Sequence, residues 1–412
     1  MPDIKDAELL DSADPLSSWR ERFLLPDGVV YLDGNSLGAL PSHVPDALDK
    51  VVRGQWGEHL IQAWTEDDWW GAPLRIGDRI GSLLGAAAGQ ITVGESTSVQ
   101  MFNALVGAVR LRPGRRLLIT DPEHFPTNRY LAQSVAGLCG LEVLEVPVPE
   151  LADILREHGE QVAVVAYGTV DFRTGRLWDM QTVTSAAHTA GALVVWDLCH
   201  AVGALPLELD AVGVDLAVGC TYKYLSGGPG SPAFIYVAQR HQQAFEPPLT
   251  GWHGHARPFD MEPVFESAPG ISRARISTPH VLSLLALEAA LEVFTGVEMT
   301  DVRAKNLSLG DFFIACFHEQ LAGLGFDLVT PREHNLRGSQ LTLAHVEAHA
   351  LMKALTERKV IGDVRPPDLL RFGFNALYVS HTDIHRAVTT LREIAISGEH
   401  RQPRFRTRSL IT

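Results

Sequence analysis

The sequence has few cysteines and no excess of positive charge. Only four of its 412 residues are cysteine, and none of Cys139, Cys199, Cys220 and Cys316 is paired at metal-ligand spacing. We therefore expect reduced thiols that fill core space, as in cytoplasmic proteins, and no metal site. Lysine and arginine total 35 against 49 aspartate and glutamate, a net charge of −14. Because a nucleic-acid-binding surface needs a basic excess, this balance argues against nucleic acid as a partner.

Long apolar runs, internal repeats and low-complexity segments are also missing. No stretch of about 18 apolar residues occurs, so we expect no membrane span. The N-terminus is acidic and lacks an apolar stretch behind basic residues, which excludes a typical signal peptide. Hydrophobic residues make up 46% of the chain and charged residues 20%, as in soluble globular proteins. These features predict a soluble cytoplasmic protein of two or three domains.

The middle of the chain alternates between strand and helix patterns. Helices are expected at 97–109, 180–190, 345–359 and 382–396, and strands at 116–120, 141–148, 162–167, 192–197, 216–220, 233–237, 340–344 and 369–374. Apolar strands alternating with helices predict an α/β fold with a mostly parallel sheet covered on both faces. We expect an N-terminal arm at 1–30, with a polar helix ending near Leu25. A large domain at 31–280 and a linking helix with a smaller α+β domain at 281–412 should follow.

Two reactive side chains follow successive predicted strands. Asp197 ends the run ALVVWD, and Lys223 comes shortly after the run VDLAVGC. Taken singly, Asp197 could cap a turn and Lys223 could be a surface lysine. Together they match the needs of pyridoxal 5'-phosphate (PLP), which requires a lysine for a Schiff base and a carboxylate facing its pyridine nitrogen. Because ligands bind at the carboxyl ends of parallel strands, both groups can reach one site.

A third feature fits the phosphate of such a cofactor. Ser96, Thr97 and Ser98 open an apolar-periodic helix, and hydroxyls with free N–H groups at a helix N-terminus bind phosphate. A simple N-cap would use the same residue types. Phe125 follows another predicted strand and could stack on a cofactor ring, although an ordinary core aromatic is an equally good interpretation.

Several longer segments resemble the kynureninases, which are fold type I PLP enzymes related to class V aminotransferases. The resemblance runs from about Tyr31 to Val388. It is carried by YLDGNSLGALP, HFPTNRY, WDLCHAVGALPLEL, CTYKYLSGGPGSPAFIYV, LTGWHGH, ISRARISTPHVLSLLALEAALEVF and LLRFGFNALYVSHTDIHRAV. It implies hydrolysis of L-kynurenine, and of its 3-hydroxy form, to anthranilate or 3-hydroxyanthranilate and L-alanine. The expected setting is tryptophan degradation or NAD biosynthesis, and the expected assembly is a homodimer.

The resemblance also implies roles for single residues. Lys223 would carry PLP and remove the substrate α-proton, and Tyr222 would relay a proton, unless Tyr224 does so. Asp197 would bind the pyridine nitrogen with His200 behind it. Arg371 would grip the substrate α-carboxylate, and Trp64 would contact the substrate. The cofactor-binding set would comprise Thr97, Ser98, Phe125, Pro126, Thr127, Asn128, Asp197, His200, Tyr222, Lys223 and Trp252, with Thr278 supplied by the partner subunit.

Two positions depart from the pattern of the family. Asn128 stands where an aspartate is expected, which puts a charge-dependent role there in doubt. Thr278 stands where some members have asparagine, and its hydroxyl can still donate a hydrogen bond.

Three alternatives remain at this stage. A cysteine desulfurase or selenocysteine lyase would need a cysteine on a mobile loop, whereas Cys316 lies in an apolar helical pattern. A non-catalytic PLP-binding protein could keep Lys223 and Asp197 without Arg371. A cofactor-free lysine aldolase would leave Asp197 and the Ser96–Ser98 cup unexplained.

Overall fold

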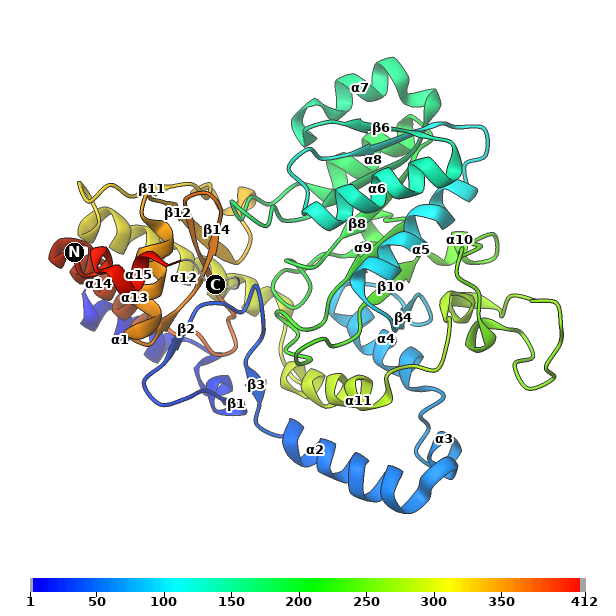
Figure 1. Cartoon of the computed structure of the whole chain (residues 1–412), viewed down its shortest axis with the longest axis horizontal. Coiled ribbons are helices and arrows are strands. Elements are labelled where there is room, and N and C mark those ends of the chain that lie inside the picture. Colours follow the sequence, from blue (N-terminus) through cyan, green and yellow to red (C-terminus); the bar gives the residue numbers. More distant parts are fainter. Residues whose placement is uncertain (1–2, 408–412) are drawn as a thin grey trace.

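Seven strands form the sheet of the larger lobe, and the side chains of all of them except the edge strand β6 are almost wholly apolar and buried (Figure 1). Every residue of β4, β5, β9 and β10 is buried, as expected where helices cover both faces. Only β10 runs in the direction opposite to the other six strands, so the sheet is mostly parallel, as predicted. The strand order is β4 (Ile91–Val93), β10 (Phe234–Val237), β9 (Leu216–Gly219), β8 (Leu193–Asp197), β7 (Val162–Gly168), β5 (Leu117–Thr120) and β6 (Glu142–Glu145).

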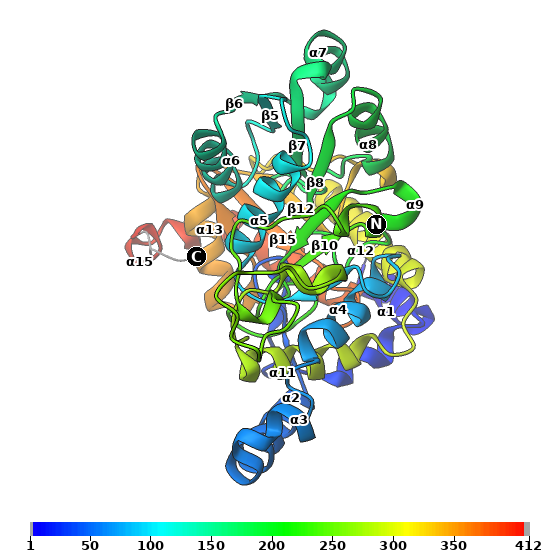
Figure 2. The same ribbon diagram turned by 90° about the vertical axis from the view of Figure 1, so that its right-hand side faces the viewer.

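This computed structural model describes residues 3–407. In the larger lobe α5 and α6 lie on one side of the sheet, and α8 and α9 lie on the other (Figure 2). The helices of this lobe are α4 (Ala72–Leu83), α5 (Thr97–Arg110), α6 (Pro126–Cys139), α7 (Leu151–His158), α8 (Met180–Thr189), α9 (Leu209–Val212) and α10 (Gln239–Gln242).

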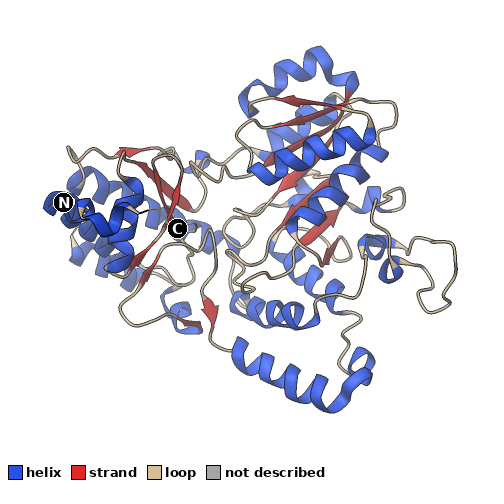
Figure 3. Ribbon diagram, in the orientation of Figure 1, coloured by secondary structure: helices blue, strands red, loops and turns tan. Residues whose placement is uncertain are grey.

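A second, antiparallel sheet forms the smaller lobe. Its strand order is β11 (Asp327–Leu328), β12 (Gln340–Ala344), β15 (Leu369–Gly373) and β14 (Asp363–Arg365). The apolar helix α11 (Val281–Ala290) precedes this lobe in the chain. The helices that follow are α12 (Met299–Gln320), α13 (Ala348–Glu357), α14 (His381–Ser397) and α15 (Pro403–Arg406). Strands are confined to the two lobes and to short pairs near the N-terminal segment (Figure 3).

The N-terminal segment packs on the smaller lobe. Helix α1 (Ile4–Ala13) contacts α14, and β2 (Val30–Tyr31) pairs with β13 (Val360–Ile361). Strand β1 (Phe23–Leu24) pairs with β3 (Leu40–Pro41). The prediction of one helix reaching Leu25 was wrong. Asp14 precedes Pro15 and has an extended backbone, because a residue before proline disfavours the helical region, and only a 3-10 turn follows at Ser17–Arg22.

Helix α2 (Val44–Lys50) continues through a π-helical segment, Val51–His59, toward α3 (Ala63–Glu66), and this unit projects from the body (Figures 1 and 2). Further 3-10 turns span Leu60–Gln62, Val148–Glu150, Gly159–Gln161, Trp252–Gly254, Gly270–Ala274, Leu291–Phe294, His334–Leu336 and Glu399–Arg401. Within residues 3–407 we find no helix long and apolar enough to cross a membrane.

All eight predicted strand runs contain a strand, and all four predicted helices are present. Strands of only two or three residues were missed, because so short a run carries no period; these are β1, β2, β3, β4, β11, β13 and β14. The domain boundaries at 30/31 and 280/281 stay a prediction, and their outermost residues, 1–2 and 408–412, lie outside the described residues.

Candidate active site

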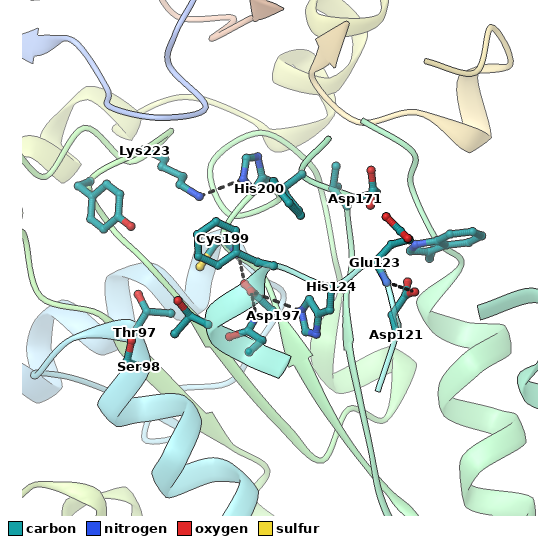
Figure 4. Close-up of a pocket in the computed structure, with 18 residues that line it drawn as sticks. Thr97, Ser98, Asp121, Glu123, His124, Asp171, Asp197, Cys199, His200 and Lys223 are labelled. Atoms are coloured by element: carbon teal, nitrogen blue, oxygen red, sulfur yellow. Dashed lines mark hydrogen bonds and ion pairs between the residues drawn. The ribbon is translucent and has the colours of Figure 1, made fainter. Parts of the chain in front are cut away.

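A cavity of about 240 Å³ lies where β5, β7 and β8 end and α5 begins (Figure 4). It brings together Lys223, Asp197 and the first residues of α5, as the strand-end argument predicted. Its wall is formed by Thr97, Ser98, Asp121, Glu123, His124, Phe125, Thr127, Asn128, Gly168, Val170, Asp171, Phe172, Trp178, Asp197, Cys199, His200, Tyr222 and Lys223.

Asp197 is a buried carboxylate held in its charged form. Asn128 Nδ2 donates to Asp197 Oδ2 at 2.6 Å, and the backbone N–H of Cys199 donates to Oδ1 at 2.8 Å. His124 Nε2 lies 3.7 Å from Oδ2. Burial alone would raise the pKa of Asp197, but His124 and the Cys199 N–H lower it below its usual range. The carboxylate is therefore ionised at neutral pH and can pair with a cation in the cavity.

Lys223 is half-buried and bonded to His200. Lys223 Nζ lies 3.0 Å from His200 Nε2 (Figure 4). His200 Nδ1 lies 3.1 Å from Gln340 Oε1. We expected His200 to support Asp197, but its hydrogen bonds go to Lys223 and Gln340. His200 is thus placed to exchange a proton with the lysine.

The N-terminus of α5 faces the cavity through Thr97 and Ser98. Ser96 is the N-cap, and its side chain accepts a hydrogen bond from the N–H of Val99 at 3.4 Å. Ser96 is absent from the cavity wall, so the structure separates the cap from the two residues that face a ligand. The first N–H groups of a helix have no intrahelical partner, which suits this end to an anion.

The aromatic wall is built from Phe125 and Phe172, whose rings meet edge to face with centroids 5.2 Å apart. Phe125 is 44% exposed, which leaves its face free to stack on a planar ligand. Tyr222 lines the cavity, whereas Tyr224 is buried and donates to the carbonyl of Ser339 at 3.3 Å. Of the two tyrosines, only Tyr222 is placed to act on a ligand here.

Five predicted site residues lie outside this cavity wall: Pro126, Trp64, Trp252, Thr278 and Arg371. Pro126 and Thr278 are exposed. Trp64 and Trp252 both pack against His253, with ring centroids 5.9 and 4.4 Å from it. Pro126, Trp64, Trp252 and Thr278 are thus no part of this cavity wall, whereas Arg371 is joined to it by a hydrogen bond to the carbonyl of Phe172.

Arg371 is buried in the smaller lobe and already has partners. Its Nε donates to Asp363 Oδ1 at 2.8 Å, and its Nη2 donates to Asp363 Oδ2. Nη2 also donates to Ser36 Oγ at 2.9 Å, and Nη1 donates to the carbonyl of Phe172. These four contacts leave one Nη1 hydrogen without an acceptor among the described residues. To bind a carboxylate through two parallel hydrogen bonds, Arg371 must therefore give up one of its four present contacts.

Sequence reasoning missed several wall residues, including Asp121, His124, Asp171 and Phe172. All four lie within about four residues after the end of β5 or β7. The rule that placed Asp197 and Lys223 at the carboxyl ends of parallel strands applies equally to these positions.

Comparison with known proteins agrees with this geometry. Residues 302–391 match the family described as the kynureninase C-terminal domain. A kynureninase of Deinococcus radiodurans is 46% identical over 95% of this chain and 96% of its own length. A kynureninase of Burkholderia pseudomallei is 43% identical over 99% of both chains.

Solved structures share the fold at much lower identity. An apo cysteine desulfurase of Thermococcus onnurineus NA1 superposes with a TM-score of 0.78 at 15% identity, covering 92% of this chain and 98% of its own. The cysteine desulfurase CsdA of Escherichia coli gives 0.78 at 19% identity, with 93% and 98% coverage. A C-DES variant with glycine covalently linked to its PLP cofactor gives 0.79 at 14% identity, with 91% and 99% coverage. The fold is therefore that of the fold type I PLP enzymes, and the full-length identity to curated relatives shows that this chain belongs to the kynureninase family.

Proposed function

We propose that the protein uses PLP to hydrolyse L-kynurenine to anthranilate and L-alanine, and that it also accepts the 3-hydroxy form. The observation that carries this proposal is the meeting of Lys223, ionised Asp197 and the N-terminus of α5 around one cavity. Family membership adds the substrate, because curated relatives that are 46% and 43% identical to this chain are named for it. We further propose that the reaction serves tryptophan breakdown or NAD biosynthesis.

The residues of the cavity fit PLP. Asp197 would face the protonated pyridine nitrogen, since its carboxylate is buried, ionised and held by two donors. Thr97 and Ser98 would hold the phosphate, and Phe125 would stack on the ring. Thr127 and Asn128 complete the same wall. When bound, PLP supplies an electron sink for negative charge at the substrate α-carbon.

The chain itself moves the protons. Lys223 Nζ, once released by the substrate amine, would take the α-proton, and His200 Nε2 beside it would share that charge. Burial raises the pKa of Tyr222 above its usual value, so its phenol stays protonated and acts as a proton donor. Arg371 would bind the α-carboxylate after exchanging the carbonyl of Phe172 for the substrate, because its other contacts are to charged or hydroxyl groups.

We also propose a cytoplasmic homodimer. Support comes from predicted ligand contacts that lie outside the chain's own cavity, at Trp64, Trp252 and Thr278, and that a second copy could supply. Large apolar side chains of the same region, such as Phe259 and Met261, are 68% and 77% exposed. The four cysteines are free, which suits a reducing compartment.

A turnover assay tests the proposal. Purified protein with added PLP and L-kynurenine should form anthranilate and alanine in equal amounts. Lys223→Ala should abolish turnover, whereas the control Lys5→Ala, at an exposed lysine of α1, should not change it. PLP uptake without either product would refute the substrate assignment. A desulfurase activity, the alternative suggested by the fold, would instead convert cysteine to alanine and release its sulfur as sulfide when a thiol reductant is added.

A further inference from the structure

The amide of Gln340 is fixed in one orientation. Gln340 begins β12 in the smaller lobe and is 1% exposed. Its Nε2 donates to the carbonyl of Phe172 at 3.0 Å, and Asn35 Nδ2 donates to its Oε1 at 3.3 Å. Because a backbone carbonyl can only accept and an amide NH₂ can only donate, these contacts define which end of the Gln340 side chain is oxygen.

That oxygen determines which ring nitrogen of His200 carries a proton. Gln340 Oε1 lies 3.1 Å from His200 Nδ1 and can only accept, so Nδ1 is the protonated nitrogen. Burial, followed by Lys223, Arg371 and Arg365, lowers the pKa of His200 well below its ordinary value, against an opposing effect of Asp197. The ring is therefore neutral at neutral pH and carries a single N–H. Its Nε2 is left as a bare acceptor, 3.0 Å from Lys223 Nζ.

We propose that Gln340, supported by Asn35, is a positioning residue that keeps His200 in its Nδ1–H form so that Nε2 accepts a proton from Lys223. The inference rests on the proposed role of Lys223 as the PLP lysine, because an amine must lose its third proton before it attacks an aldehyde. The neutral lysine nitrogen then adds to the aldehyde carbon of PLP, a C=N bond replaces the C=O bond, and water leaves. His200 Nε2 takes the proton given up by the ammonium and passes it on to solvent, because the lowered pKa of the ring favours its neutral form.

This arrangement links the two lobes. His200 and Lys223 follow β8 and β9 of the larger lobe, whereas Gln340 belongs to the second sheet. The lysine therefore meets a correctly protonated histidine only while the smaller lobe is in place.

The test measures how fast PLP joins Lys223, which requires no kynurenine. PLP is removed from the protein and added back, and its absorbance change is followed from pH 6 to pH 10. Gln340→Leu removes the acceptor from Nδ1, whereas Gln340→Glu keeps an oxygen there. Gln242→Leu is the matched control, since Gln242 is also buried and bonded to two backbone carbonyls, of Gly89 and Val237, away from the cavity.

We expect Gln340→Leu to slow PLP linkage about fivefold at pH 7, the effect of one hydrogen bond, and to move the rate profile to higher pH. Gln340→Glu should stay within about twofold of the unmodified protein at pH 7, because a carboxylate also accepts from Nδ1. An unchanged profile in Gln340→Leu, or an equal loss in Gln340→Glu and Gln340→Leu, would overturn the proposal.

A measurement on the unmodified protein keeps the inference testable if a variant fails to fold. In PLP-free protein labelled with ¹⁵N-histidine, the His200 signals can be identified by their absence in His200→Asn. A proton on Nδ1 is expected, and a proton on Nε2 would refute the inference. Failure of the proposed function is distinguishable, because a protein that links PLP without cleaving kynurenine leaves the role of Gln340 intact.

Discussion

Replacing Arg371 with methionine should cost stability as well as substrate binding. Arg371 and Asp363 are 1% and 2% exposed and are joined by two hydrogen bonds, so removing one partner leaves a buried charge. Loss of one member of a buried pair costs about 3–5 kcal/mol. Here Asp363 keeps Arg365 Nη2 at 2.8 Å and Ser36 Oγ at 2.6 Å. We therefore expect the lower end, about 3 kcal/mol.

The pH dependence of this loss follows from the carboxylate. Burial favours the neutral acid, but Arg371 and Arg365 hold the pKa of Asp363 below its usual value. Without Arg371 that pKa rises. The destabilisation should therefore be largest at neutral pH and shrink as the pH falls and Asp363 takes up a proton.

Urea denaturation at pH 7 and pH 5, with PLP held at one concentration, measures both effects. The double variant Arg371→Met with Asp363→Asn should be about 1–2 kcal/mol more stable than Arg371→Met alone, because the fully buried carboxylate charge is removed, while Arg365, which also loses Asp363, is 27% exposed. The KM for kynurenine should rise in both, since neither has the guanidinium. A cost below about 1 kcal/mol for Arg371→Met, or additive losses in the double variant, would refute the reasoning.

Three further changes have distinct expected results. Gly38→Ala should destabilise the protein by about 1–3 kcal/mol and lower its PLP occupancy, because the added Cβ would lie 2.2 Å from the carbonyl oxygen of Lys223. Urea titration measures the stability and absorbance measures the PLP content, and no change in either would contradict the close packing. Asn128→Asp should destabilise PLP-free protein by about 1–3 kcal/mol at pH 7, because the new carboxylate replaces a donor to Asp197 and repels it. The loss should be smaller at pH 5, where the new carboxylate and Asp197 can share a proton, and a pH-independent loss would count against this account. Hydrogen bonds from His241 and His188 outweigh burial and lower the pKa of Asp215 to about 2. The Asp215 carboxylate therefore stabilises the fold at pH values above its unfolded pKa near 4, and this contribution is lost as the pH falls toward 2. Asp215→Asn should remove about 2 kcal/mol at pH 7 and flatten acid unfolding in this window, and an acid-unfolding curve like that of the unmodified protein would show that Asp215 contributes little.

Local patterns in the sequence predicted most of the larger lobe. The strands around Asp197 and Lys223 are apolar, buried runs whose length and period mark them without tertiary information. The N-terminal segment shows the limit of this reasoning. Helix α1 ends at Ala13 because of Pro15, which is a local signal, but its packing on α14 joins residues from opposite ends of the chain.

The sequence by itself determined the fold class, the PLP lysine and aspartate as candidates, and the family. These depend on short segments whose composition and spacing are local properties of the chain. Only the tertiary structure decided that Gln340 and Asn35 orient His200, that Asp363 occupies Arg371, and that Trp252 and Thr278 lie away from the cavity of their own chain. The contacts among these join residues on different lobes or strands, and the positions depend on how distant segments pack. Which atom of a side chain faces its partner also depends on that packing, and the periodicity of a sequence does not contain this information.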